Sequence, residues 1–381
     1  KLSDIKAVIA ACAGLYLEAV ADSNTATPNS TVKIKFEAIN RSPQSVRLNS
    51  VKLSDGGNIK KNVTLIQNES QKFESTYAVS KTETFSTPYW LNNKGTLGMY
   101  KIDDQKLIGL PETPHNTTAT FELSFSDEVI TFERPIVYKM NDPVKGEVYR
   151  PFEIIPEVSV KVAEKVIIFE TTQQKDISVI ITAGRDNLEG YIQIDHPEDW
   201  NVYPEKQKVA INTKGQEQVI VFTVIPPKGQ SEGRLSPKVS IGDNFYTKSL
   251  VAIDYDHIPL QTVLLPCELK VVRLDIKKKG DNIGYIEGAG DAVPESLKQI
   301  GYNVTILKPE DISRENLNHF DAVVVGIRAY NIVDELKFKQ PQLMEYIKAG
   351  GNLIVQYNTS RGLVMNDLAP YKLELSQDRV T

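Results

Sequence analysis

Apolar and polar residues alternate along most of the chain between Thr31 and Val144. The segments 32–36 and 120–125 show this period of two, and turn sequences such as 55–58 separate successive runs. The period places consecutive side chains on opposite faces of a strand, so each strand is half buried in an antiparallel sheet. Short strands at this spacing, with almost no helical periodicity, predict a β-sandwich of about a hundred residues of the Ig-like class.

A second all-β unit follows the first. Prolines and a glycine in the segment 142–151 indicate a linker, and we place the boundary near Gly146. Further strand patterns begin beyond it, at residues 166–169, 177–182, 190–194 and 219–225. The sequence therefore predicts one sandwich over residues 23–145 and another over residues 146–276.

The pattern changes after the lysine-rich segment 277–280. Strand-like and helical runs now alternate, at residues 283–286, 294–300, 304–307, 322–325, 341–349 and 352–356. This alternation predicts a parallel sheet, and the continuously apolar run 322–325 is typical of a strand covered on both faces. We expect an incomplete, doubly wound α/β domain over residues 277–381, with strand order 2-1-3-4.

The chain begins in a helical pattern. Apolar residues at helical spacing predict a helix from Asp4 to Ala21, through Ile5, Val8, Ile9, Cys12 and Leu15. We interpret residues 1–22 as a connector from an upstream domain. The other end, 371–381, reads as a new segment that begins before the α/β sheet is complete, so we expect the chain to be a fragment of a longer protein.

Composition excludes several classes of function. With 41% hydrophobic and 24% charged residues, the chain resembles an ordinary soluble globular protein. The net charge of -5 and the lack of a basic stripe interleaved with aromatics argue against a nucleic-acid partner. The sequence contains no apolar run of the roughly 18 to 20 residues that a membrane-spanning helix requires. Cys12 and Cys267 lie in different predicted domains, which argues against a disulfide framework.

Four sequence segments together resemble a known family. They are STPYWL (86–91), DPVKGEVY (142–149), GYIEGAGD (284–291) and GIRAYN (326–331). Together they resemble the region after the catalytic domain in large PIG-L (LmbE-like) deacetylases of Bacteroidetes type, over essentially the whole chain. The resemblance implies an upstream zinc-dependent de-N-acetylase domain as partner, with no cofactor in the present chain and a periplasmic or secreted location.

Two further similarities concern single domains. The second sandwich is similar to the NPCBM-associated domains of glycosidases, through HPEDWNV (196–202) and the later Pro226-Pro227. The last domain resembles the start of a class I glutamine-amidotransferase-like fold. These resemblances imply a carbohydrate as a candidate ligand.

The sequence lacks recognisable catalytic machinery. Its histidines are isolated from one another, without the spacing of metal ligands, at positions 115, 196, 257 and 319. An amidotransferase needs a cysteine on the turn after a strand, where this chain has YNTS at 357–360. Ser360 lacks the Gly-x-Ser-x-Gly setting of a hydrolase. We therefore predict no catalytic residue and no metal site.

The loops that follow the predicted parallel strands form our candidate ligand site, because an open α/β sheet leaves a crevice at this edge. Its residues are Glu287, Gly288, Asp291, Arg328, Tyr330, Asn331 and Asn358. Arg328 has two interpretations. It forms a structural ion pair with Glu287 or Asp291, or it remains free to bind a carboxylate or phosphate. Asp291 has its own alternative role, in capping the helix that follows.

Aromatic residues offer a second candidate site. Tyr89, Trp90 and Tyr100 could stack on sugar rings, although packing in a core is the alternative for each. Trp200 lies where sandwich modules commonly bury a tryptophan, so we predict that it is a core residue.

These observations leave three hypotheses about function. The first is a non-catalytic accessory region that orients, stabilises or targets a deacetylase of sugar conjugates. The second is a stand-alone carbohydrate-binding or protein-interaction module. The third is an enzyme with an unfamiliar site in the α/β domain, which would require a cluster of titratable groups with perturbed pKa values.

Overall fold

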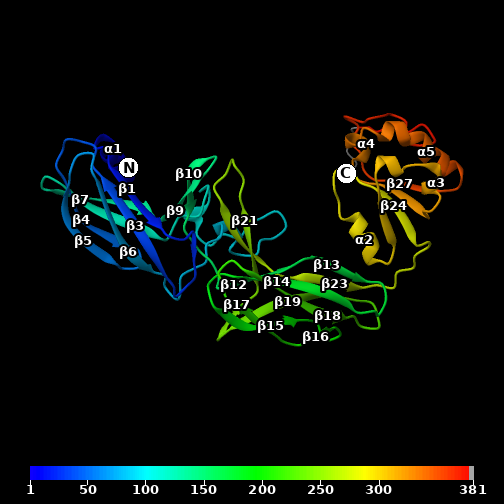
Figure 1. Cartoon of the computed structure of the whole chain (residues 1–381), viewed down its shortest axis with the longest axis horizontal. Coiled ribbons are helices and arrows are strands. Elements are labelled where there is room, and N and C mark those ends of the chain that lie inside the picture. The colour runs from blue at the N-terminus through cyan, green and yellow to red at the C-terminus, as the bar shows by residue number, and fades with distance from the viewer. Residues whose placement is uncertain (377–381) are drawn as a thin grey trace.

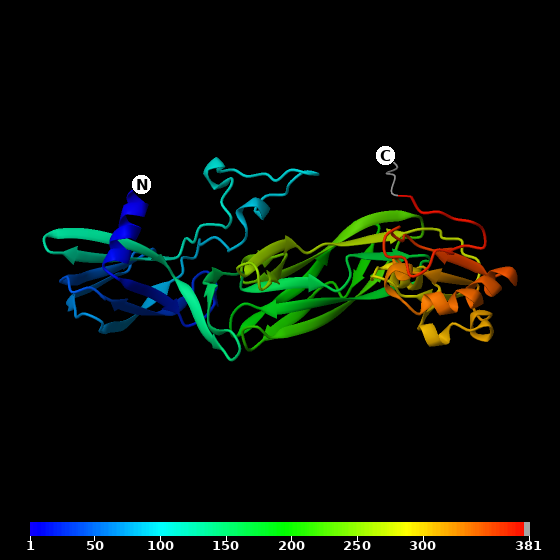
Figure 2. The ribbon, with the colours of Figure 1, turned by 90° about the horizontal axis from the view of Figure 1, so that it is seen from above.

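The computed structural model describes residues 1–376 of the chain. Strands predominate, and three modules lie in a row between the two ends of the chain (Figure 1). Viewed from above, the row is elongated, and a long connection projects from the first module (Figure 2). Residues 377–381, the end of the segment expected to begin at Tyr371, lie outside the described part.

Two sheets form the first module, a β-sandwich. The first sheet contains, in spatial order, β10 (Gly146–Pro151), β9 (Val137–Asp142), β1 (Tyr16–Ala21), β3 (Thr31–Ile39) and β6 (Ser70–Ala78). The second contains β5 (Asn58–Leu65), β4 (Val46–Leu53), β7 (Thr118–Phe125) and β8 (Glu128–Pro135). Residues that alternate along β3, such as Ile34 and Phe36, pack in the core with Leu48 and Phe121 of the opposite sheet. The antiparallel sheets predicted from this alternation are therefore present, with one parallel pairing, between β1 and β9.

The helix predicted over residues 4–21 is wrong in its second half. Helix α1 spans Leu2–Cys12, and β1 then lies between β3 and β9. Gly14 has a φ of +57°, a left-handed conformation that ends the helical path. Pairing with two neighbouring strands, which buries Leu17 and Ala19, outweighs the helical propensity of this segment. The connector helix is thus shorter than predicted, and residues 16–21 belong to the first sandwich.

The boundary predicted near Gly146 also moves. This residue follows the turn of the β9–β10 hairpin, and it pairs with Asp142. The Asp142 carboxylate accepts backbone hydrogen bonds from Val144 and Lys145, both 2.8 Å long, which closes the turn. The sheet of the first sandwich therefore continues to Pro151, so the proline and glycine mark a hairpin instead of a linker.

Two short strands complete the first module. Strand β11 (Glu153–Ile154) pairs in parallel with β2 (Thr25–Ala26). Between β6 and β7 the chain makes a long excursion over residues 79–117, which contains the 3-10 helices η1 (Tyr89–Leu91) and η2 (Gln105–Leu107). This excursion is the cyan projection in Figure 2.

The second module is another sandwich. One sheet consists of β12 (Val158–Val162), β14 (Lys175–Ala183), β18 (Glu217–Ile225) and β16 (Asn201–Tyr203). The other consists of β13 (Val166–Phe169), β23 (Leu269–Arg273), β19 (Ser231–Ile241), β15 (Leu188–Asp195) and β17 (Gln207–Ile211), with β20 (Asn244–Tyr246) paired to β19. A separate hairpin of β21 (Lys248–Ile253) and β22 (Gln261–Pro266) extends toward the first module (Figure 1). Trp200 is fully buried in the core of this sandwich, as predicted.

The third module contains a parallel sheet of four strands. Their spatial order is β25 (Asn303–Leu307), β24 (Asn282–Ile286), β26 (Ala322–Val325) and β27 (Asn352–Val355), which is the order 2-1-3-4. The helical elements are α2 (Val293–Gln299), η3 (Pro309–Asp311), α3 (Arg314–Leu317), α4 (Ala329–Ile332) and α5 (Leu336–Lys348). Val293 and Leu297 of α2 pack with one set of strand residues, whereas Leu317 of α3 and Leu343 of α5 pack with another. The ends of β24, β26 and β27 consequently bring the predicted loops to one edge.

Candidate functional site

The three predicted loops of the third module lie together. The Ala289 amide donates to the Ile327 carbonyl at 2.8 Å, and the Arg328 amide donates to the Tyr357 carbonyl at 2.7 Å. Gly288 permits this close approach, because a Cβ atom there would lie 2.1 Å from the Ile327 oxygen. The loops after β24, β26 and β27 therefore form one continuous surface.

Asp291 is a structural centre of this surface. Its carboxylate accepts hydrogen bonds from the Tyr285 hydroxyl at 2.7 Å and from the Val293 amide at 2.8 Å. The Ile327 amide donates a third at 3.3 Å. Burial alone would raise the pKa of Asp291, but these hydrogen bonds outweigh it and lower the pKa. Asp291 thus joins the β24 loop to the start of α2 and to the β26 loop, although it lies one residue before Ala292, the N-cap of α2.

Three other residues of the predicted ligand site also hold the loops together. Tyr330 is fully buried, and its hydroxyl donates to Gln340 at 2.6 Å. The Asn358 side chain accepts the Tyr330 amide at 3.1 Å, and Asn331 donates to the Thr359 carbonyl at 3.0 Å. Their polar groups are therefore used within the protein.

Arg328 and Glu287 remain exposed at this edge. Within residues 1–376 neither Glu287 nor Asp291 forms an ion pair with Arg328, so the first of its two interpretations, a structural ion pair, is wrong. Arg328 lines a cavity of about 960 Å³ together with Tyr357 and Arg361. Its backbone has a φ of +56°, which is uncommon for a residue other than glycine.

Substitutions separate the structural residue from the exposed one. We expect Asp291→Ala to lower the free energy of unfolding of the third module by about 2 kcal/mol, because a hydroxyl and backbone amides lose a charged acceptor. Arg328→Ala, the matched control, should change it by less than about 0.5 kcal/mol. Hydrogen exchange of peptides from β24 and α2 measures both. Equal losses in the two variants would contradict this division of roles.

The three aromatic residues of the second candidate site differ in burial and in their contacts. Tyr89 is buried, donates to the Leu110 carbonyl at 3.1 Å and packs edge-on against Trp90 at 4.8 Å. Tyr100 is 65% exposed on the excursion. Tyr89 lines a pocket of about 650 Å³. Trp90 is partly exposed, and Tyr89 is held in place by its hydroxyl contact.

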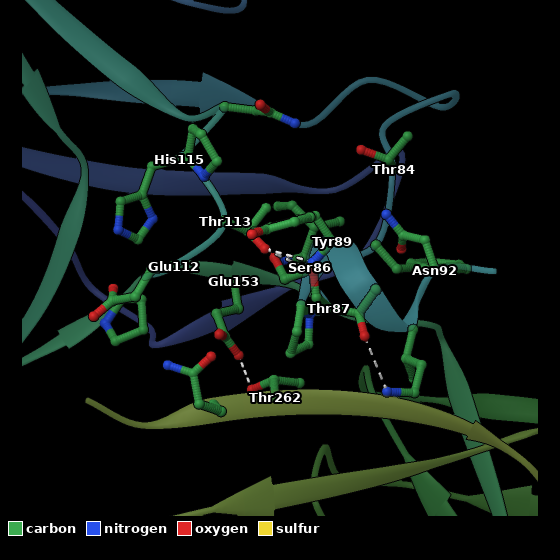
Figure 3. Close-up of a pocket in the computed structure, with 18 of the residues that line it drawn as sticks. Thr84, Ser86, Thr87, Tyr89, Asn92, Glu112, Thr113, His115, Glu153 and Thr262 are labelled. Atoms are coloured by element: carbon green, nitrogen blue, oxygen red, sulfur yellow. Dashed lines mark hydrogen bonds between the residues drawn. The ribbon is translucent and has the colours of Figure 1, made fainter. Parts of the chain in front are cut away.

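A pocket that the sequence reasoning missed lies where the first two modules meet (Figure 3). It has a volume of about 650 Å³. One side of the pocket comes from residues 83–89 and 112–117 of the excursion, and another comes from the segment 151–154, which includes β11. The third side comes from β22 and its flanking residues. Segments far apart in the sequence thus form one concave site with both polar and apolar walls.

Glu153 is the most unusual group in this pocket. Its side chain is only 8% exposed, and burial raises its pKa to about 7. The Thr262 hydroxyl donates a hydrogen bond to Oε2 (Figure 3). The sequence holds one signal that could have pointed to it, a glutamate flanked by the apolar residues Phe152 and Ile154.

The histidines lie in separate places. His115 lines the junction pocket, His196 contacts the Pro197 carbonyl through Nδ1 at 3.0 Å, and His319 contacts the Asn316 carbonyl at 3.2 Å. Residues 1–376 contain no group of three or more histidine, cysteine or acidic side chains placed to hold a metal ion. In the same range, no helix has the length and apolar character needed to cross a membrane.

Comparisons with known proteins do not assign the chain to a family. No family model and no curated protein matches it. Among solved structures, Salmonella α-2-macroglobulin reacted with methylamine aligns with 68% of this chain and 16% of its own length, at 10% identity and a TM-score of 0.23. The chain therefore spans about a sixth of that protein.

Two smaller proteins give similar scores. WR4, a C. elegans MSP family member, aligns over 30% of this chain and 98% of its own, at 13% identity and a TM-score of 0.19. A protein of unknown function from Porphyromonas gingivalis W83 aligns over 68% and 98%, at 8% identity and a TM-score of 0.17. Similarities at these scores carry no inference about function. The resemblances to PIG-L, NPCBM-associated and amidotransferase-like proteins stay predictions.

Proposed function

We propose that this chain is a non-catalytic accessory region that orients and spaces an upstream catalytic domain of the same polypeptide. The sequence resemblance suggests that this domain is a zinc-dependent de-N-acetylase of sugar conjugates, in a periplasmic or secreted protein. The spacing role is supported by one observation: side chains join adjacent modules directly at both junctions. Such contacts resist the relative motion that flexible linkers allow.

The first junction is held from two sides. Lys214 of the second module donates to Ser23 Oγ at 2.8 Å and to the Thr25 carbonyl at 2.6 Å. Burial lowers the pKa of this lysine, as expected for an enclosed cation. On another side, Arg150 of β10 pairs with Asp254, which follows β21, at 2.8 Å. The contacts lie on different elements, so together they oppose both bending and twisting.

The second junction is centred on Lys175. Its amino group donates to the Ile168 carbonyl at 2.7 Å, to Glu170 at 3.0 Å and to the Gln299 carbonyl at 2.8 Å. The Gln299 side chain in turn accepts the Ile168 amide at 3.1 Å. Ile168 lies on β13, an edge strand, so α2 of the third module covers backbone groups that would otherwise stay unpaired.

Removing the second junction should loosen the third module. We expect the double variant Lys175→Met, Gln299→Ala to broaden the distance distribution from small-angle X-ray scattering. Proteolysis within residues 274–281 should become at least about tenfold faster, because this exposed connection is then free to adopt the extended conformations that a protease binds. Lys161→Met, on an exposed position of β12, is the control. Unchanged scattering and proteolysis in the double variant would contradict a spacing role that depends on these contacts.

Finer fold assignments belong to the same proposal. The strand order 2-1-3-4 and the helices packed on the sheet support a partial doubly wound α/β domain, similar to the amidotransferase-like fold. The two sandwiches are proposed to be of the Ig-like class.

A second candidate function is a stand-alone carbohydrate-binding or protein-interaction module. The observation that favours it is the concave pocket at the first junction, whose volume of about 650 Å³ suits a small ligand. Titration with a panel of neutral glycans tests this alternative. Binding of a neutral glycan would favour this alternative, and the absence of binding by the whole panel would contradict a carbohydrate-binding role.

A further inference from the structure

The junction pocket has an acidic lining. Its charged side chains are Glu83, Glu112, Glu153 and Lys248, and His115 is also part of the wall. With Glu153 ionised and His115 neutral, three carboxylates face one ammonium group, so the lining carries a net charge of -2. Such a lining repels phosphate and carboxylate ligands and attracts cations.

Glu153 lies in this pocket without a cationic partner. Within residues 1–376 it forms no ion pair, and its single side-chain hydrogen bond comes from Thr262 to Oε2. Oε1 therefore has no partner in the described chain. A glutamate residue with only 8% of its surface exposed is costly to ionise unless a positive group pairs with it. No positive group within the described residues balances a charge on Glu153.

The remaining walls suit a small organic cation. Phe85, Tyr89 and Phe152 supply apolar surface, whereas Ser86 and Thr113 are held by contacts within the protein. Residues 1–376 contain no group of three or more histidine, cysteine or acidic side chains placed to hold a metal ion, so an organic cation is the better match for this pocket. An ammonium group on a carbon skeleton satisfies both the buried carboxylate and the apolar walls.

We propose that the junction pocket binds a small polar molecule through a primary ammonium group that pairs with the Glu153 carboxylate. This site goes beyond the spacing role and does not depend on it. The pairing replaces an unfavourable buried charge with a charge-assisted hydrogen bond, so binding and ionisation of Glu153 support each other. Affinity should therefore rise with pH through the range in which Glu153 ionises, as long as the amine remains protonated.

Matched probes test the proposal. Calorimetric titration of the whole chain at pH 7 uses glucosamine and N-acetylglucosamine, which share a sugar ring but differ in charge, together with spermidine as an amine without a ring. We expect both amines to bind, and glucosamine to bind at least about tenfold more tightly than N-acetylglucosamine. Lowering the pH to 5 should weaken glucosamine binding, because Glu153 is then protonated.

Variants assign the effect to one carboxyl group. Glu153→Gln keeps the size of the side chain and should remove the preference for glucosamine, whereas Glu164→Gln, at an exposed position outside the pocket lining, should keep it. Circular dichroism of each variant shows that the chain is folded. Equal binding of the two sugars would overturn the proposal in favour of a neutral glycan site. Absence of binding by both amines at millimolar concentration, or a preference that survives Glu153→Gln, would also overturn it. Scattering from the double variant Lys175→Met, Gln299→Ala reports on spacing separately.

Discussion

Trp200→Ala should lower the free energy of unfolding of the second sandwich by about 3 to 5 kcal/mol, the range for removing a fully buried aromatic side chain. Trp200 has 0% exposure and packs edge-on against Phe169 with ring centres 5.3 Å apart. Its indole nitrogen donates to Ser231 at 3.2 Å. The substitution would therefore leave both a cavity and a hydroxyl without its donor.

The other tryptophan is the matched control. Trp90 is partly exposed on the excursion, so Trp90→Ala should cost less than about 1.5 kcal/mol. Because a chain of several modules does not unfold in one step, hydrogen exchange of peptides from β14 and β18 is the suitable measurement. A stable Trp200→Ala variant that had lost binding of sugars would contradict the core assignment and favour a stacking role.

The local pattern predicted much of the fold. The alternation in residues 32–36 survives in β3, whose Val32, Ile34 and Phe36 are buried. The strand order of the third module follows from short right-handed connections between buried strands. The helix prediction was wrong for residues 16–21 because β1 pairs on both sides with strands that are distant in the sequence. A helical spacing of apolar residues carries no information about such pairing. The domain boundary predicted near Gly146 was wrong because a linker and a hairpin turn use the same residue types.

The sites were harder to predict than the fold. Asp291 and Arg328 were expected to lie near each other because the ends of parallel strands meet at one edge of a sheet. The structure places their loops together at this edge. The sequence could not show that Tyr285 and two backbone amides donate hydrogen bonds to the Asp291 carboxylate. Asp291 consequently forms no ion pair with Arg328. Glu153 was missed because its pocket combines segments separated by more than a hundred residues, and no local period records such a meeting.

Glu153→Gln should stabilise the chain at pH 8 and have a much smaller effect at pH 5. Burial raises the pKa of Glu153 from the ordinary 4.5 to about 7. A group with a raised pKa contributes stability below its unfolded pKa, and this contribution is lost as the pH rises through the folded value. At pH 8 the native chain therefore holds a buried, unpaired carboxylate. A neutral isostere removes this cost, and the gain is about 3 kcal/mol, the free energy that corresponds to raising the pKa from 4.5 to about 7.

Thermal unfolding between pH 5 and 8 measures this dependence. The other titratable groups that face the pocket are Glu83, Glu112, His115 and Lys248, and they could add pH dependence of their own. Glu112→Gln is therefore the control, which should unfold with the pH profile of the parent chain. A Glu153→Gln variant whose stability relative to the parent is the same at pH 5 and 8 would show that Glu153 is already ionised and paired. In that case the pocket would have no unbalanced charge for an amine to neutralise, so this measurement tests the premise of the binding site without any ligand.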